Sequence, residues 1–155
     1  AWGRNNCGQG NPPDVNNYIA IAAGGYYSLA LSSDGSIIAW GGNDYGQAIP
    51  PDGNNYIAVS AGYVHSLALR FDGSIVAWGR NNYGQANPPV GNNYIDIATG
   101  SWHSLILSSD GSIVGLGRND DWEGNWVGQA TPPDGNDYIA VSAGGYHSLA
   151  LRSDG

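Results

Sequence analysis

The chain has 155 residues, of which 41% are hydrophobic and only 12% are charged. Its five basic residues are all Arg, and 13 Asp and Glu residues give a net charge of −8, which argues against nucleic acid or anionic lipid as a partner. No apolar run approaches the roughly 20 residues of a membrane-spanning helix, so no membrane insertion is expected. A single Cys argues against a disulfide-rich fold.

A repeat accounts for the whole chain. A Trp-Gly pair, replaced once by Leu-Gly, recurs at a constant step of 38 residues, and a Ser-Leu-Ala-Leu or Ser-Leu-Ile-Leu segment recurs at steps of 38, 38 and 44. The six additional residues of the longer step fall between Asp120 and Val127. Such self-similarity indicates a repeat architecture. We place the repeats at residues 18–55, 56–93, 94–137 and 138–155, with the last one completed by residues 1–17.

Each repeat predicts three short strands, described here for the first one. Residues 19–22 form an apolar run typical of a buried strand. Residues 28–31 form a second strand, and the following Asp34-Gly35 marks a hairpin, because Gly accepts a positive φ. Residues 37–40 return as the third strand before a long proline-containing loop. No segment has helical periodicity, so each unit is an antiparallel β-meander.

The strands are apolar on both faces, with small side chains on one and large ones on the other. This pattern suits sheets packed face to face around an axis, and the sequence therefore predicts an all-β fold, a β-propeller built of four 38-residue antiparallel blades. Two arrangements are open: a closed four-bladed ring, or a part of a larger propeller or assembly. A linear β-solenoid is the less favoured alternative.

One stretch of the second repeat carries a resemblance to a known family. It reads Ala-Gly-Tyr-Val-His-Ser-Leu-Ala-Leu over residues 61–69, then Asp-Gly-Ser over 72–74, then Ala-Trp-Gly-Arg-Asn-Asn-Tyr-Gly-Gln over 77–85. It resembles the repeat of the regulator-of-chromosome-condensation family, and the short repeat with its Pro pair is most similar to the bacterial branch, which includes propeller-type β-lactamase inhibitors.

The resemblance implies a seven-bladed propeller that binds other proteins through one rim. This chain has four repeats, and it lacks the basic loops that eukaryotic members use on chromatin. Nucleotide exchange on a GTPase and chromatin binding therefore do not carry over, and no inhibitor contact residue can be transferred.

Three histidines occupy equivalent positions in successive repeats, with Tyr27 in the first. Three imidazoles that converged on an axis could bind zinc. The alternative, which we favour, is that each ring forms hydrogen bonds that order its own blade. No cofactor is expected. The histidines are His65, His103 and His147.

The candidate binding residues are aromatic and acidic side chains in loops. The insertion contributes Asp121, Trp122, Glu123 and Trp126, which suit a binding anchor or a calcium site, or simply a solvated loop whose Trp side chains cover the blade edge. The turns after the first strands contribute one aromatic each, which we expect near one rim, either for recognition or for packing. These are Tyr26, Tyr63, Trp102 and Tyr146.

No catalytic constellation is apparent. Ser66 follows His65 directly, and neighbouring side chains of a strand point to opposite faces. We therefore expect a non-enzymatic scaffold that recognises a protein partner through its rim loops. Two alternatives are a self-associating structural protein, a ring or filament completed by neighbouring chains, and a lectin. Low charge without Lys suggests an extracellular or cell-surface bacterial protein.

Overall fold

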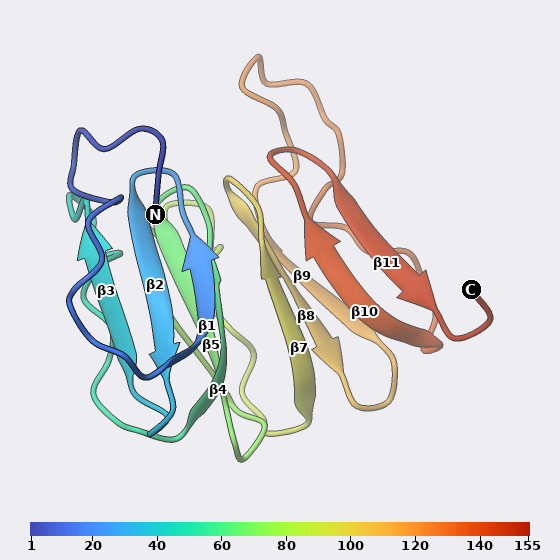
Figure 1. Ribbon diagram of the computed structural model, residues 1–155. Coiled ribbons are helices and arrows are strands. Elements are labelled where there is room, and N and C mark those ends of the chain that lie inside the picture. Colours follow the sequence, from blue (N-terminus) through green and yellow to red (C-terminus); the bar gives the residue numbers. More distant parts are fainter.

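The computed structural model describes residues 1–155 and contains strands but no α-helix. Eleven strands form four antiparallel sheets that stand side by side in an open arc (Figure 1). No helix of membrane-spanning length and hydropathy is present. The first three sheets are β1 (Tyr18–Ala23), β2 (Tyr27–Ser32) and β3 (Ile37–Gly41); β4 (Tyr56–Ala61), β5 (His65–Arg70) and β6 (Ile75–Gly79); and β7 (Tyr94–Thr99), β8 (His103–Ser108) and β9 (Ile113–Gly117). The fourth sheet has two strands, β10 (Tyr138–Ala143) and β11 (Ser148–Arg152).

The three strands predicted for each repeat are confirmed in the three complete repeats, and each is slightly longer than its predicted range. The Asp-Gly hairpin has the expected geometry, because Gly35 has a φ of 81° and its N–H donates to the Ser32 carbonyl at 2.9 Å. Asp34 closes the turn by accepting hydrogen bonds from both the amide and the hydroxyl of Ser36. These bonds lower the pKa of Asp34. The repeated aspartates are therefore turn residues.

The hydrophobic core lies between the sheets. In the first joint, Leu29 and Leu31 of β2 are buried against Tyr56 and Ala68 of the next sheet. In the second joint, Leu67 and Leu69 pack in the same way against Tyr94 and Ile106. The leucine-bearing face of one blade thus meets the opposite face of the next, which also carries large side chains such as Tyr94 and Ile106, so the expected pairing of large with small side chains is found only in part. Each sheet is stable only with neighbours, because one face of a three-stranded sheet leaves too much apolar surface in water.

A glycine before each second strand allows the blades to approach closely. A Cβ added to Gly62 would lie 2.5 Å from Cε1 of His65 and 2.6 Å from the carbonyl oxygen of Gly100 in the next blade. Gly24 lies against Tyr27 and the Gly62 carbonyl in the same way. These glycines are required by steric contact with the neighbouring blade, since neither has a positive φ.

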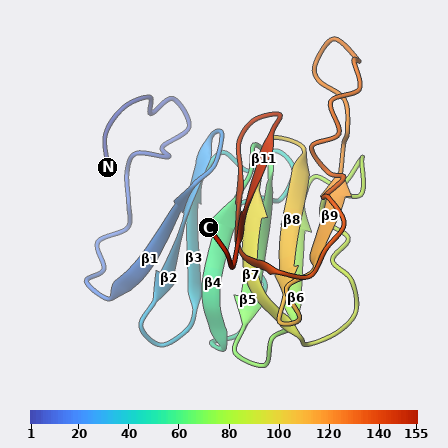
Figure 2. The same ribbon diagram turned by 90° about the vertical axis from the view of Figure 1, so that its right-hand side faces the viewer.

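The closed four-bladed ring, one of the two arrangements expected, does not form. Residues 1–17 lie against the first sheet, whereas β11 lies at the opposite end of the arc and pairs with β10 alone (Figures 1 and 2). Completion of the fourth repeat by residues from 1–17 stays a prediction.

The substitution Gly62→Ala tests the joint between blades. We expect it to lower the free energy of unfolding by about 2 kcal/mol or more, because the added methyl overlaps both a ring and a backbone carbonyl. Urea unfolding followed by circular dichroism measures the change. Gly145→Ala is the matched control, since its Cβ would meet only the Ser101 hydroxyl, at 3.5 Å. Equal stability of the two variants would contradict the close contact.

Candidate functional site

A serine at the start of each second strand connects neighbouring blades. Ser104 Oγ donates to the carbonyl oxygen of Gln85 at 2.9 Å and lies 3.0 Å from His65 Nε2. Ser148 Oγ repeats this arrangement with Gln129 and His103. The histidine thus reaches the serine of the following blade. In the first joint the Tyr27 hydroxyl takes the place of the imidazole and lies 2.7 Å from the Ser66 Oγ.

The hydrogen bonds of these pairs differ from those of a catalytic dyad. The only hydroxyl proton of Ser104 is given to a backbone carbonyl, so Nε2 of His65 must be the donor in their shared hydrogen bond. A nitrogen that already carries a proton cannot act as a general base toward that serine. Both residues are also fully buried. The repeated Ser-His pairs therefore join blades and do not form a catalytic dyad.

Burial keeps two of the imidazoles neutral. Desolvation, with a smaller contribution from His103, lowers the pKa of His65 to about 4. Desolvation, followed by the charge of His147, lowers the pKa of His103 to about 4 as well. The rings bond successive serines along the arc and form no cluster with other metal-ligating side chains. The structure thus supports the hydrogen-bonding alternative, with the bond directed to the next blade instead of the ring's own.

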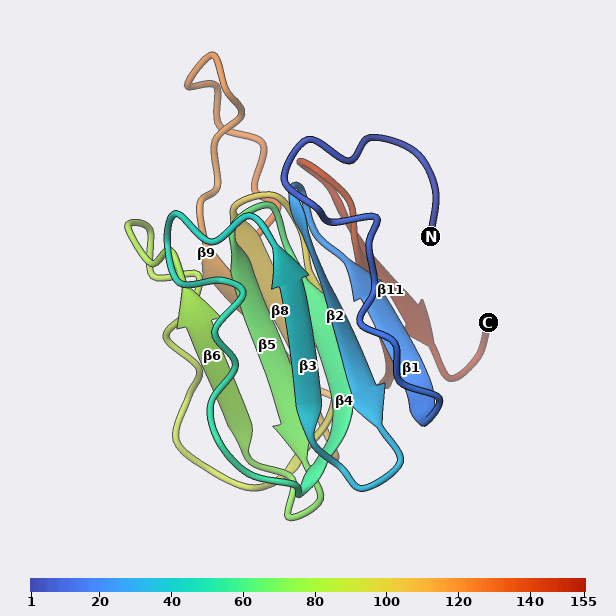
Figure 3. The same ribbon diagram turned by 60° about the vertical axis from the view of Figure 1, so that its left-hand side comes forward.

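The loops at one edge of the arc form a continuous rim. In every complete blade the first and third strands end at this edge, so the turn after the first strand and the loop after the third strand lie together (Figure 3). The insertion after β9 protrudes from the same edge, and the Asp-Gly turns lie at the opposite one (Figure 2). The loops that carry the predicted aromatics and the insertion therefore lie on one rim.

Four aromatic side chains from three successive repeats make a contiguous row on this rim. The rings of Tyr26 and Tyr63 have centroids 5.5 Å apart in an edge-to-face arrangement. Trp102 continues the row at 5.5 Å from Tyr63, and Tyr83 stands at 6.0 Å from Trp102. The hydrogen bond to Tyr26 raises the pKa of Tyr63, whose hydroxyl is therefore neutral at physiological pH. We call these four residues the aromatic row.

Arginines cover the faces of these rings. The Arg80 guanidinium lies 4.9 Å from the centroid of Trp102 and 4.8 Å from that of Tyr45. Arg4 lies over Tyr26, and Arg118 lies over Tyr83. Cation–π contacts of this kind fix the direction of both partners. Three of the five Arg residues of the chain thus belong to the rim.

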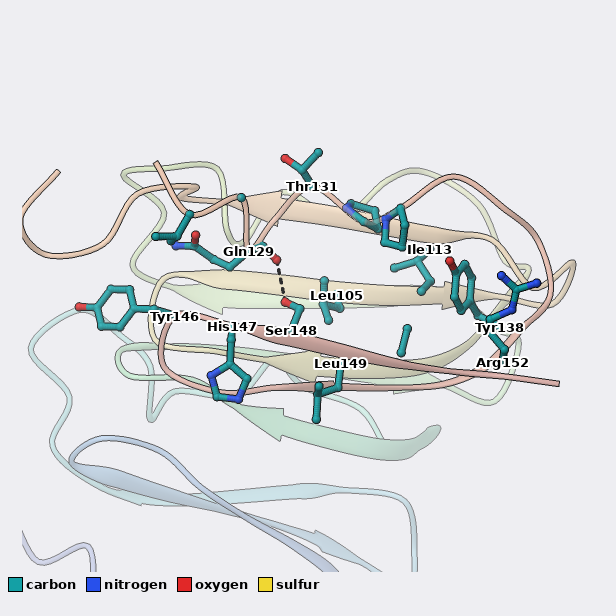
Figure 4. A pocket seen from close by; sticks show the side chains of 15 residues that line it. Leu105, Ile113, Gln129, Thr131, Tyr138, Tyr146, His147, Ser148, Leu149 and Arg152 are labelled. Atoms are coloured by element: carbon teal, nitrogen blue, oxygen red, sulfur yellow. Dashed lines mark hydrogen bonds between the residues drawn. The ribbon is translucent and has the colours of Figure 1, made fainter. Parts of the chain in front are cut away.

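These arginines were not predicted from the sequence, although a signal was present. Arg follows the Trp-Gly or Leu-Gly pair at Arg4, Arg80 and Arg118, whereas Gly42 occupies that position in the first complete repeat. A basic residue repeated beside repeated loop aromatics suggests pairing across loops. The fourth predicted turn residue, Tyr146, lies beside a cavity next to β11, with His147 and Ser148 (Figure 4).

The insertion forms a small hairpin that presents its tryptophans to solvent. Asp120 and Trp126 form an isolated antiparallel bridge, and Trp122 and Trp126 are 74% and 68% exposed. They therefore do not cover the blade edge. Asp121 accepts hydrogen bonds from the backbone amides of Glu123 and Asn125, and the bonds from Asn125 lower its pKa. The acidic side chains of the loop do not gather into a cation site.

An asparagine fixes the base of every rim loop that follows a third strand. Oδ1 of Asn119 accepts from the amide of Ala130 at 2.7 Å, across the whole insertion. Asn43 and Asn81 make the same bond to the amides of Ala48 and Ala86, across loops without an insertion. The carbonyl oxygen of Asn119 also accepts from the amides of residues 127 and 128. The blade therefore holds the two ends of this loop together whatever lies between them.

Comparison with known proteins identifies the repeat. The profile of the regulator of chromosome condensation (RCC1) repeat matches residues 18–47, 56–85 and 94–121, which is more than half of the chain. The chain belongs to the RCC1 repeat family. The matched segments contain the three complete sheets of this RCC1-repeat protein and the beginning of its insertion. No curated protein sequence matches it significantly.

Solved structures show the fold of the RCC1-repeat chain in longer proteins. Prp20p from Saccharomyces cerevisiae is 23% identical, with a TM-score of 0.73 over 92% of this chain and 45% of its own. The ectodomain of the Physcomitrella patens receptor kinase CR4 is 22% identical, with a TM-score of 0.79 over 99% of this chain and 43% of its own. Human WBSCR16 is 22% identical, with a TM-score of 0.73 over 92% and 48%. The chain thus spans less than half of the length of these structures.

The buried imidazoles predict a loss of stability in mild acid. A folded-state pKa of about 4, below the ordinary 6.5, means that the unfolded chain binds more protons between these values, so stability falls as the pH falls through this window. From pH 7 to pH 5 we expect a loss on the order of 3–4 kcal/mol for the two histidines together. Urea unfolding at both pH values measures it. The control is His65→Tyr with His103→Tyr, which copies the tyrosine of the first joint and should remove most of the loss; an unchanged loss would contradict the assignment.

Removal of the insertion tests its independence from the blades. Deletion of residues 121–126 leaves the spacing of the other rim loops, so the Asn119 bond to Ala130 can form as it does at Asn43. We expect the free energy of unfolding to change by no more than about 0.5 kcal/mol, as for other surface changes. Thermal and urea unfolding measure this. A loss of several kcal/mol would show that the loop supports the arc.

Proposed function

We propose that this chain is a non-enzymatic scaffold that binds a protein partner through the rim formed by the aromatic row and the insertion. The observation that carries this proposal is the contiguity of Tyr26, Tyr63, Trp102 and Tyr83, which come from three successive repeats and meet at one edge. The opposite edge carries short Asp-Gly turns and no comparable row.

The composition of the rim suits protein recognition. Trp, Tyr and Arg are the residues most enriched in binding hot spots, because they combine a large contact area with hydrogen-bonding capacity. In the aromatic row these side chains are already held by one another and by Arg4, Arg80 and Arg118. Binding therefore costs little further side-chain entropy, which favours affinity. The two exposed Trp of the insertion add a second, protruding contact on the same edge.

Structural relatives give coarse support for this function. Prp20p is described with binding properties to Gsp1p and histones, and yeast RCC1 (Prp20) is described in complex with Kap60. Those partners belong to those proteins. For this chain the likeness supports a protein partner in general, and the acidic net charge of −8 and the absence of Lys argue against binding through contacts to nucleic-acid phosphates.

The covered ring faces favour a protein over a glycan. A sugar stacks on an open aromatic face, whereas Arg4 and Arg80 lie over the faces of Tyr26 and Trp102. Planar guanidinium groups held in this way present their N–H groups to carboxylate or carbonyl oxygens of a partner. We place this surface outside the cell on the basis of the low charge and the absence of Lys.

Selection of peptide ligands tests the proposed function. Random peptides displayed on phage are panned against the immobilised chain, and the affinities of the selected peptides are then measured for variants. We expect Trp102→Ala, and separately Trp122→Ala with Trp126→Ala, to weaken binding about tenfold or more. Phe71→Ala is the matched control, because Phe71 is 83% exposed at the opposite edge.

The affinities of the selected peptides for the rim variants and for the control decide the outcome. Because the tryptophans of the insertion are exposed, their replacement leaves the fold intact, and the circular dichroism of every variant checks this. Peptides that lose affinity with the rim variants and keep it with Phe71→Ala support the proposal. Peptides that respond only to Phe71→Ala, or selection that enriches no peptide above background, would overturn it.

A further inference from the structure

Arg80 is held on the rim by aromatic rings from the two neighbouring repeats. Its guanidinium lies 4.8 Å from the ring centroid of Tyr45 in the preceding repeat and 4.9 Å from that of Trp102 in the following one. Its Nη1 also donates to the Tyr45 hydroxyl at 3.4 Å. Every other arginine that lies over an aromatic ring contacts only one. The packing of three successive blades therefore fixes the orientation of this planar group.

One edge of the Arg80 guanidinium has no acceptor in the chain. Nε is buried and makes no hydrogen bond, and Nη2, which points the same way, makes none either but is not buried. Together these two N–H groups form a fork that matches the two oxygens of a carboxylate. Buried donors are normally paired in folded proteins, so an unpaired edge on a rigidly held arginine calls for a physical reason.

The equivalent arginine of the next repeat shows which group this edge accepts. Nε of Arg118 lies 3.4 Å from Oδ2 of Asp120, two residues further along the chain. In the repeat of Arg80 the corresponding position is Asn82, which carries no negative charge. The remaining ion pairs of the chain belong to Arg152, so Arg80 has no carboxylate partner of its own.

We infer that Arg80 is a carboxylate-binding site of the rim, occupied by an Asp or Glu side chain or by the C-terminal carboxylate of a protein partner. The inference rests on the proposed function and adds the chemistry of the partner's contact group. Nε lies buried beside the rings of Tyr45 and Trp102, in a region of low dielectric where such a hydrogen bond is stronger than in water.

The charge of the chain limits the partner further. A run of acidic residues would be repelled by the net charge of −8, because like charges brought together across an interface cost several kcal/mol. A single carboxylate flanked by apolar or aromatic residues avoids this repulsion and can also contact the rings of Tyr63 and Tyr83, which are 38% and 45% exposed. The expected partner segment therefore combines one carboxylate with apolar neighbours.

Acetate tests the site without any partner. The NMR signals of the arginine Nε–H groups are followed as sodium acetate is added near neutral pH, with sodium chloride at equal ionic strength as the control. We expect a saturable shift of the Arg80 signal with a Kd on the order of 10–100 mM, as for one charge-assisted contact. Arg70 is the matched reference, because its Nε is also unbonded but it contacts a single ring. It also lies near Asp72, whose pKa is lowered first by the Ser74 hydroxyl and further by the charge of Arg70.

The variant Asp120→Asn extends this titration. It removes the carboxylate bound by Arg118, so the Arg118 signal should begin to respond to acetate while Arg80 keeps its affinity. An Arg80 signal that shifts no more than that of Arg70, or as much with chloride as with acetate, overturns the inference. An Arg118 signal that stays unresponsive in Asp120→Asn also counts against it, because the inference rests on the equivalence of these two edges.

Peptides selected against the immobilised chain test the contribution of the partner. We expect those that lose affinity with Trp122→Ala and Trp126→Ala to share one Asp or Glu. Arg80→Lys, which keeps the charge and loses the fork, should weaken them about tenfold, and replacement of the peptide's Glu by Gln should then weaken them no further. Arg70→Lys is the control and should have no effect. Amidation of the peptide C-terminus lowers affinity only if the terminal carboxylate is the ligand.

This inference and the proposed function fail in different ways. Peptides that depend on the tryptophans of the insertion but bind Arg80→Lys as tightly as the unmodified chain overturn the inference and leave the proposed function standing. If selection enriches no peptide, the proposed function fails, and the acetate titration decides separately whether Arg80 binds carboxylates. Circular dichroism of Arg80→Lys checks that a loss of affinity is not a loss of fold.

Discussion

The structure depends on one serine hydroxyl in each joint between blades. It is held at the start of the second strand and gives its proton to the carbonyl of the loop that precedes its blade, and in the joints that contain a histidine it receives a hydrogen bond from the blade before that loop. Three parts of the chain are fixed by one oxygen. In the joints at Ser66 and Ser104 these groups are buried, so loss of a partner would leave a polar group without compensation, at a cost of about 1–3 kcal/mol. The apolar joint supplies most of the driving force, and this hydroxyl sets how the blades are oriented.

Fixed orientation is what allows a composite surface to exist. Tyr26, Tyr63 and Trp102 belong to different repeats and touch only because successive turns are held at a constant separation. The arginines add a second layer of order, since Arg80 contacts rings that come from two further loops. The insertion is different, because its Trp122 and Trp126 side chains contact little of the blade and are exposed to solvent. The rim thus combines a rigid row with an independent protrusion.

The fold was predictable because its signals are local and occur four times. Alternation, the Asp-Gly turns and the repeat length identify the strands and their packing class, and the structure confirms them. The partners of the repeated histidines were not predictable in this way. His65 and Ser104 are 39 residues apart, and their contact follows from the packing of two blades, not from a pattern within one. The positions of the arginines over the rings depend on loop geometry for the same reason. The sequence could not predict whether the ring closes, because a repeat determines the contact between neighbouring blades and not the number of blades.

The asparagine bond at the base of each rim loop that follows a third strand separates the length of that loop from the stability of the blade. Asn119 joins the ends of a loop that is six residues longer than its counterparts, so the blade accommodates additional residues ahead of Gln129, whose carbonyl oxygen still accepts from Ser148. The entropy cost of a longer closed loop grows only with the logarithm of its length. Each blade therefore offers one position at which new sequence can be acquired, lost or exchanged while the arc is inherited unchanged. Recognition can diversify at these positions one loop at a time, and a foreign peptide inserted between Asn82 and Tyr83, ahead of Gln85, should be displayed beside the natural insertion on the same edge.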